Sequence, residues 1–136
     1  MCVVKVARQF VNAINDHDVD ALAALMTEDH CFIDSMGTTV RGREVMKQGW
    51  LQYYTMVPDY QIEVSDIVHT DNMVAMFGKA WGTYTRDGQI KPENRWEVLA
   101  AWKAVVDGEQ IAHWQVYADL TLVCDIVRRE SPNSDG

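Results

Sequence analysis

The sequence predicts an α+β domain, with helices in its first half and an antiparallel sheet in its second half. Before Pro58, apolar residues recur at helical spacing, whereas after Tyr60 they alternate with polar residues. A run of helices followed by a run of strands is typical of the α+β class. The length of 136 residues fits one domain, which we expect over residues 1–127, followed by a polar tail over residues 128–136.

Three helices are expected in the first half. The first carries one apolar stripe at helical spacing, formed by Val3, Ala7, Phe10, Val11 and Ile14. The second begins after Asp18, whose carboxylate can accept the free N–H groups of the next turn, and continues to about Met26. The third starts near Gly42 and ends before Pro58, since proline disfavours helix in the residue that precedes it.

Strands account for most of the remaining chain. After a polar break at 27–29, a short strand is expected over residues 31–34, with a turn at 35–37. Longer strands are expected from Tyr60 onward, then over residues 73–85, 95–106 and 110–119. The alternation slips at Asp66, which indicates a β-bulge.

The distribution of tryptophan predicts aromatic side chains on both faces of the sheet. Trp81, Trp96, Trp102 and Trp114 all fall in expected strands, and neighbouring strand residues point to opposite faces. Three helices can cover only one face of a long sheet. We therefore expect a homodimer that forms through the outer face.

Charge and composition exclude several classes of partner. The chain has 20 acidic and 12 basic residues, a net charge of −8, and a field of that sign repels phosphates. We therefore expect no nucleic-acid partner and no anionic membrane partner. The longest apolar run, at 21–26, is too short to span a bilayer, and the N-terminus lacks the apolar region of a secretory signal.

The cysteine and histidine patterns predict neither disulfides nor a metal site. Cys2, Cys31 and Cys124 are widely spaced among apolar neighbours, as buried reduced thiols usually are. This pattern favours the reducing cytoplasm. The four histidines show no metal-ligand spacing, and no nucleotide-binding or nucleophile motif is present. We expect no metal and no cofactor.

Asp34 is the strongest candidate for chemistry. It ends a short apolar strand, shares a face with Phe32 and is followed by an aromatic helix. A carboxylate in such surroundings loses hydration, which disfavours its charged form and makes it a better proton acceptor near neutrality. The alternative is that Asp34 caps the turn that contains Gly37, a common role for aspartate.

Glu97 is the second candidate, because it lies inside an apolar strand between Trp96 and Val98. On a concave face it could donate a proton or orient a ligand. The alternative is an ion pair with Arg95 or Lys79, which would contribute little to stability.

Strand parity separates two sets of residues near the end of the chain. Trp114 shares a face with Val116 and Ala118, an apolar set that suits a cavity wall. His113 lies on the other face with Gln115, a position that suits solvent or a dimer contact.

Four stretches, residues 10–22, 26–34, 41–44 and 107–119, resemble the nuclear transport factor 2-like superfamily. The closer resemblance is to its SnoaL-like and ketosteroid-isomerase-like branch, and it covers residues 3–125. It implies a conical barrel made of a strongly bent antiparallel sheet wrapped around the helices, with a deep apolar pocket and usually a dimer. In the isomerases the aspartate at the position of Asp34 moves a proton between carbon atoms.

The chain also departs from that branch. Phe10 stands where the isomerases carry a tyrosine donor, and Ala101 stands at or near their protonated aspartate. Trp50 replaces a further pocket tyrosine, and its indole N–H could still donate. Val116 stands where the epoxide hydrolases carry an acid. The resemblance therefore implies the fold and the pocket but not steroid isomerisation or epoxide hydrolysis.

These observations lead to one hypothesis and an alternative. We expect a pocket enzyme that moves a proton next to a carbonyl group of a small apolar substrate, by isomerisation, cyclisation or dehydration. Asp34 is the expected base, and Trp50 with either Tyr53 or Tyr54 the expected donors. The expected ligand-contacting residues are Phe10, Phe32, Trp50, Tyr53, Tyr54, Glu97, Ala101, Trp114 and Val116. The alternative is a non-catalytic ligand-binding or dimeric interaction domain.

Overall fold

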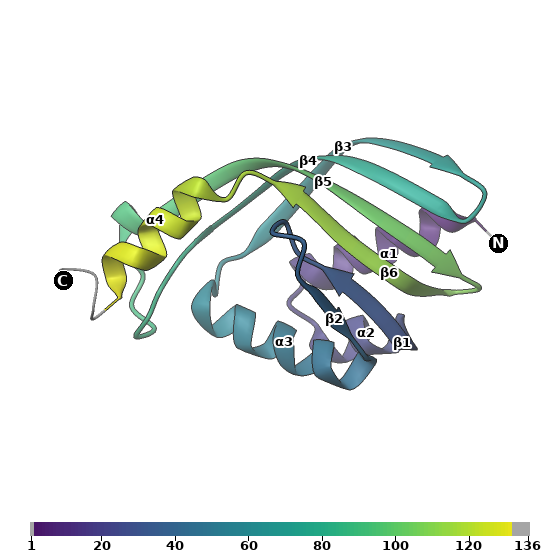
Figure 1. Ribbon diagram of the computed structural model, residues 1–136, viewed down its shortest axis with the longest axis horizontal. Helices are drawn as coiled ribbons and strands as arrows, with labels where there is room; N and C mark the ends of the chain where they lie inside the picture. The colour runs from purple at the N-terminus through teal and green to yellow at the C-terminus, as the bar shows by residue number, and fades with distance from the viewer. Residues whose placement is uncertain (1, 132–136) are drawn as a thin grey trace.

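The computed structural model describes residues 2–131, and in that range it contains four α-helices and a six-stranded sheet (Figure 1). The helices are α1 (Val3–Asn15), α2 (Val19–Ala24), α3 (Arg43–Met56) and α4 (Thr121–Glu130). The strands are β1 (Met26–Ile33), β2 (Thr39–Arg41), β3 (Gln61–Thr70), β4 (Met73–Thr83), β5 (Arg95–Asp107) and β6 (Gln110–Ala118). The predicted α+β class is confirmed.

The sheet has the strand order β2-β1-β6-β5-β4-β3 and curves over the helices (Figure 1). It is mixed rather than antiparallel, because β1 pairs with β6 in the parallel direction. It is open, with β2 and β3 at its edges, and the expected conical arrangement of a bent sheet around the helices is confirmed. Only the expectation that every strand pair is antiparallel is wrong, because β1 and β6 lie far apart in the chain and a long crossover can join parallel neighbours.

The helical half agrees with the sequence except between α2 and α3, where α2 ends early, β1 covers Met26–Ile33 instead of residues 31–34, and β2 was not expected. The carboxylate of Asp18 accepts a hydrogen bond from the backbone N–H of Ala21 at 3.0 Å, which confirms the predicted N-cap. However, α2 ends at Ala24, and Met26 begins β1. The predicted polar break at 27–29 is therefore part of a strand. Pairing of Met26 with Ile111 of β6 overrides the local helical pattern.

The middle of the chain follows the predicted pattern closely. Helix α3 covers Arg43–Met56, and the register of β3 against β4 shifts between Val64 and Asp66, where a bulge was predicted. The strands β5 and β6 lie within one or two residues of their predicted ends.

Helix α4 was not predicted, and it overlaps the expected polar tail, which begins at Arg128. The helix is held by contacts that exist only in the folded protein. Ile126 is 2% exposed, and the carboxylate of Glu130 accepts hydrogen bonds from Asn94 at 2.6 Å and Lys91 at 3.1 Å. The part of the expected tail at 132–136 lies outside the described residues.

The cysteines are free, but they are not all buried as expected. Cys31 is buried, whereas Cys2 and Cys124 are exposed. The cytoplasmic location inferred from them remains a prediction. None of the helices within residues 2–131 is both long and apolar enough to cross a membrane.

Both faces of the sheet carry aromatic side chains, as predicted. Trp96, Trp102 and Trp114 are buried on the concave face. Trp81 pairs in register with Glu97 on the convex face. Three large apolar side chains are exposed on β4, β5 and β6 of that convex face: Phe77, Leu99 and Tyr117.

Candidate active site

A cavity of about 530 Å³ lies between the concave face of the sheet and α3. Its walls come from the turn after β1, from one side of α3 and from β4, β5 and β6. Leu120, which immediately precedes α4, also lines it. A largely apolar cavity of this size is typical of a small-molecule site.

Asp34 lies on the wall of this cavity, in the turn between β1 and β2. Its Oδ1 atom accepts hydrogen bonds from the backbone N–H groups of Met36 and Thr38, both at 2.9 Å. Gly37 completes the turn with a φ of 85°, a conformation that glycine adopts without strain. The predicted turn-capping role of Asp34 is therefore confirmed, and the residue also lines the cavity. Its role as a base stays a prediction.

The two oxygens of Asp34 differ in their surroundings. Oδ1 is held by two amides, whereas Oδ2 has no hydrogen-bond partner among the described residues. The side chain is half-buried. The hydrogen bonds from the two backbone N–H groups hold the carboxylate in place through Oδ1. They leave Oδ2 able to accept a proton from a ligand.

Four aromatic residues line one part of the cavity: Trp50, Tyr53, Tyr60 and Trp96. The rings of Tyr53 and Tyr60 meet edge to face with centroids 4.9 Å apart, and Tyr60 lies 6.1 Å from Trp96. Burial raises the pKa of Tyr53 and of Tyr60 well above the usual value, so both side chains stay protonated O–H donors near neutrality.

The expected donor role of Trp50 is less well supported than that of Tyr53. The indole Nε1 atoms of Trp50 and Trp96 are buried and have no acceptor in the described part of the chain. Because Trp50 Nε1 does not reach the cavity surface, a ligand could bond to it only after the ring turns. The hydroxyl of Tyr53 is the better placed donor.

Six of the ten expected site residues line the cavity: Asp34, Phe32, Trp50, Tyr53, Trp114 and Val116. Two others lie behind its wall. Phe10 is fully buried and packs against the far side of Trp114, with ring centroids 4.7 Å apart. The hydroxyl of Tyr54 donates to the carbonyl of Ile14 at 2.8 Å, because one step along a helix turns a side chain by about 100° away from its neighbour.

Glu97 and Ala101 do not line the cavity, because strand parity places both on the convex face. Ala101 pairs in register with Phe77 and Tyr117. Glu97 lies 3.6 Å from the guanidinium of Arg95, which is the ion pair considered from the sequence. His113 is likewise away from the cavity, and its Nε2 lies 3.2 Å from the side-chain oxygen of Gln115.

Several lining residues were not among the expected site residues. Trp96, Val98 and Trp102 alternate along β5 and share one face, so strand parity could have identified them once the buried face was known. Tyr60 and Leu120 had no such signal, because only the folding of the chain brings them to the cavity.

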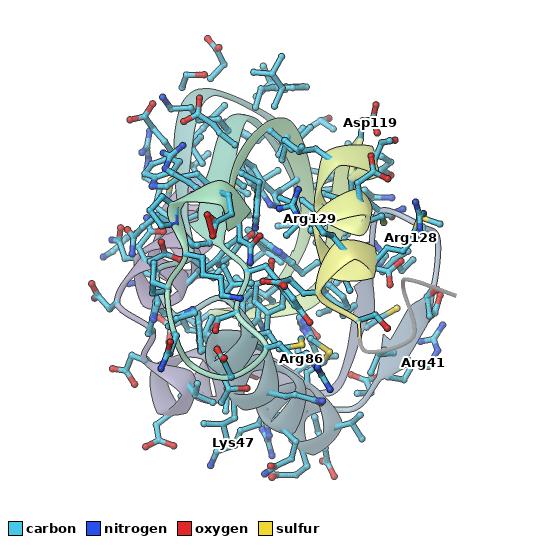
Figure 2. All side chains as sticks on the ribbon, turned by 90° about the vertical axis from the view of Figure 1, so that its left-hand side faces the viewer. Arg41, Lys47, Arg86, Asp119, Arg128 and Arg129 are labelled. Carbon is cyan, nitrogen blue, oxygen red and sulfur yellow. The ribbon has the colours of Figure 1, made fainter. Side chains whose placement is uncertain are left out.

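Among residues 2–131, one carboxylate and no basic side chain line the cavity. Within that range Asp34 is the only acidic lining residue, and no lysine, arginine or histidine lines the cavity. Figure 2 shows basic side chains on the outside of the molecule instead, including Arg41, Arg86 and Arg128. Within residues 2–131, no three histidine, cysteine, aspartate or glutamate side chains are grouped to hold a metal ion.

Comparison with known proteins identifies the family. The family model of the SnoaL-like domain matches residues 7–116. None of the curated proteins matches the chain.

Many solved structures share the fold. A proposed SnoaL-like polyketide cyclase from Shewanella denitrificans has a TM-score of 0.80 at 15% identity, covering 94% of this chain and 98% of that one. An epoxide hydrolase from M. tuberculosis has a TM-score of 0.76 at 17% identity, covering 93% and 90%. A protein with a ketosteroid isomerase-like fold from Catenulispora acidiphila, in complex with trimethylamine, has a TM-score of 0.75 at 21% identity, covering 87% of this chain and 88% of that one. At these identities the likeness concerns the fold alone.

Proposed function

The chain belongs to the SnoaL-like family, and we propose that it is an enzyme that moves a proton next to a carbonyl group of a small, largely apolar substrate. The observation that carries this proposal is the position of Asp34. In the described part of the chain, Asp34 is the one carboxylate on the wall of an apolar cavity, with one oxygen held by two backbone amides and the other without a partner. A base placed in such a cavity is a recurrent arrangement for proton abstraction beside a carbonyl.

In the proposed step, Asp34 Oδ2 takes a proton from the carbon next to the carbonyl. The electron pair of the broken C–H bond forms a carbon–carbon double bond, and the carbonyl oxygen becomes an enolate. The hydroxyl of Tyr53 donates a hydrogen bond to that oxygen, where negative charge develops. If the enolate is conjugated to a second double bond, return of the proton from Asp34 to the far carbon gives isomerisation. Attack of the enolate carbon on a second carbonyl carbon of the same substrate gives cyclisation, with the proton from Asp34 passing to the new alkoxide oxygen. Expulsion of a hydroxyl from the adjacent carbon restores the carbonyl, forms a carbon–carbon double bond and gives dehydration, with the proton from Asp34 converting the leaving hydroxide to water.

Proton abstraction can be measured without knowing the natural substrate. The probe is beta-tetralone, an apolar bicyclic ketone, and NMR in D₂O follows the exchange of its α-protons. We expect the protein to accelerate this exchange and Asp34→Asn to reduce the acceleration by about 10²–10⁴-fold, the usual contribution of a general base. The control is Asp119→Asn, because the Asp119 carboxylate bonds to Thr121 at the start of α4, outside the cavity. Unchanged exchange in Asp34→Asn would remove Asp34 from the mechanism.

A non-catalytic ligand-binding domain is the second candidate. The bonding of Asp34 Oδ1 within its own turn favours it, because this is how a purely structural aspartate is held. The same experiment separates the two candidates. If the wild-type protein binds beta-tetralone without accelerating exchange, the domain binds ligands and does not catalyse this reaction.

We also propose that two copies of the chain pair through the convex face of the sheet. Leu99 is 83% exposed, and it lies on the same face as Phe77 and Tyr117. Exposed apolar patches of this kind are typical of protein–protein contacts. Light scattering should show a dimer for the wild type and a monomer for Leu99→Glu. The control Leu122→Glu, at an exposed position on α4, should remain dimeric. If the wild-type protein is a monomer at the concentration used for the two variants, this interface does not form.

A further inference from the structure

We propose that the cavity selects uncharged ligands that carry a hydrogen-bond-accepting oxygen at the end that reaches Tyr53 and Tyr60. This inference deepens the proposed function, because it names the charge and the polar group of the ligand. It rests on the same cavity as the proposed function but does not require Asp34 to act as a base.

Two tyrosines of the cavity wall, Tyr53 and Tyr60, have hydroxyls without a hydrogen-bond partner among the described residues. The neighbouring Tyr54 differs, because its hydroxyl donates to a backbone carbonyl. The hydroxyls of Tyr53 and Tyr60 are not among the buried atoms that lack a partner, so they are accessible to a ligand. A hydrocarbon ligand that covers them would leave them without an acceptor, which is unfavourable, whereas a ligand oxygen can accept their hydrogen bonds.

The fold holds the backbone of Tyr60 in place. His17 Nε2 donates a hydrogen bond to the backbone carbonyl of Tyr60 at 2.7 Å. Two residues further along, the side chain of Asn15 bonds to both the N–H and the carbonyl of Ile62, at 2.8 and 2.9 Å. The end of α1 and the residue His17 after it therefore hold the start of β3 in place. A hydrogen-bond donor such as Tyr60 that is already positioned loses little entropy when a ligand binds.

The charge on the cavity wall disfavours an anionic ligand. Among the described residues Asp34 is the only acid on the wall and no basic residue lines the cavity, so a ligand carboxylate would be buried near a like charge without a cation to neutralise it. An ammonium group could approach Asp34 and the aromatic rings. It cannot accept a hydrogen bond, however, so it would leave the hydroxyls of Tyr53 and Tyr60 unpaired. A neutral oxygen satisfies them without introducing a charge.

Four naphthalene probes of similar shape test the selection by calorimetry: acetylnaphthalene, ethylnaphthalene, naphthoate and trimethylnaphthylammonium. We expect acetylnaphthalene to bind about tenfold more tightly than ethylnaphthalene, which corresponds to about 1.4 kcal/mol. Naphthoate and the ammonium probe should bind more weakly than the ketone. Equal binding of the ketone and the hydrocarbon, or tightest binding of either charged probe, would overturn the proposal.

Single hydroxyl deletions assign the selection to these two residues. Tyr53→Phe and Tyr60→Phe keep the ring and should each reduce the preference for the ketone over the hydrocarbon. The matched controls are Tyr54→Phe on the same helix and Tyr117→Phe on the convex face, and both should keep the preference. If neither Tyr53→Phe nor Tyr60→Phe changes the preference, the assignment is wrong.

The Asp34→Asn variant separates this inference from the proposed function. A ketone preference that survives in Asp34→Asn supports the hydroxyl pair whether or not the protein catalyses exchange. Loss of the preference in that variant, with Tyr53 and Tyr60 intact, would show that Asp34 rather than the two hydroxyls recognises the ligand.

Discussion

His30 should make the protein less stable as the pH falls from 7 to 5. Its ring is completely buried, and its Nδ1 lies 2.7 Å from the backbone carbonyl of Ile111, to which it must donate. Its Nε2 is also buried and has no partner among residues 2–131. A proton on Nε2 would therefore have no acceptor, and burial lowers the pKa of His30 below the usual value of 6.5.

The direction in which pH changes the free energy of unfolding follows from the direction of that pKa shift. A lowered pKa in the folded state means that the unfolded chain takes up a proton first, so the contribution of His30 is complete above pH 6.5 and is lost as the pH falls below it. If the folded protein stays unprotonated down to pH 5, the free energy of unfolding decreases by about 2 kcal/mol between pH 7 and pH 5. This is the largest effect that one histidine can produce over that interval.

Urea unfolding at several pH values measures the effect, with His30→Asn as the variant. Asparagine cannot titrate, so we expect His30→Asn to be less stable at every pH but to lose most of the decrease between pH 7 and pH 5. His69→Asn, at an exposed position, should keep the wild-type dependence. If His30→Asn showed the full wild-type decrease, the loss would arise elsewhere, and the reasoning from the buried ring would be refuted.

Substitutions at three further positions test contacts outside the cavity. In Gly78→Ala the added Cβ would lie against the backbone carbonyl of Glu63 in β3, so we expect a loss of about 1–3 kcal/mol or more in thermal unfolding; an unchanged Tm would contradict this. Asp18→Ala removes the cap of α2 and should cost about 1 kcal/mol, whereas Asp18→Asn should recover most of it. Glu130→Ala removes the acceptor for Asn94 and Lys91, so the amides of α4 should exchange faster with solvent while those of β5 do not. Hydrogen bonds from Asn94 and Lys91 lower the pKa of Glu130, so α4 in the wild type should lose the same protection, relative to the intrinsic exchange rate at each pH, as the pH falls through that lowered pKa.

The sequence predicted the elements whose pattern is local. The stripe of α1, the cap at Asp18, the extent of α3 and the bulge before Asp66 each depend on residues within a few positions of one another. The hydrophobic spacing and the chemistry of the capping residue are enough to specify them.

Long-range pairing decided the elements that the sequence did not predict. The start of β1 depends on Ile111, more than 80 residues away. Helix α4 depends on Asn94 and Lys91, which lie in the connection before β5. In both places the contacts that stabilise the element come from a distant segment, so the local pattern is not informative.

The candidate site, like the fold, was predicted only in part from the sequence. The sequence alone identified Asp34 as the candidate base, predicted the aromatic face of α3, and placed Trp114 and Val116 on the same face of their strand. The tertiary structure decided that Tyr53 rather than Tyr54 faces the cavity, that Glu97 lies outside it, and that Tyr60 joins it. The reason is that spacing along a strand or helix specifies which residues share a face, whereas only packing of that face against another element decides which face is enclosed.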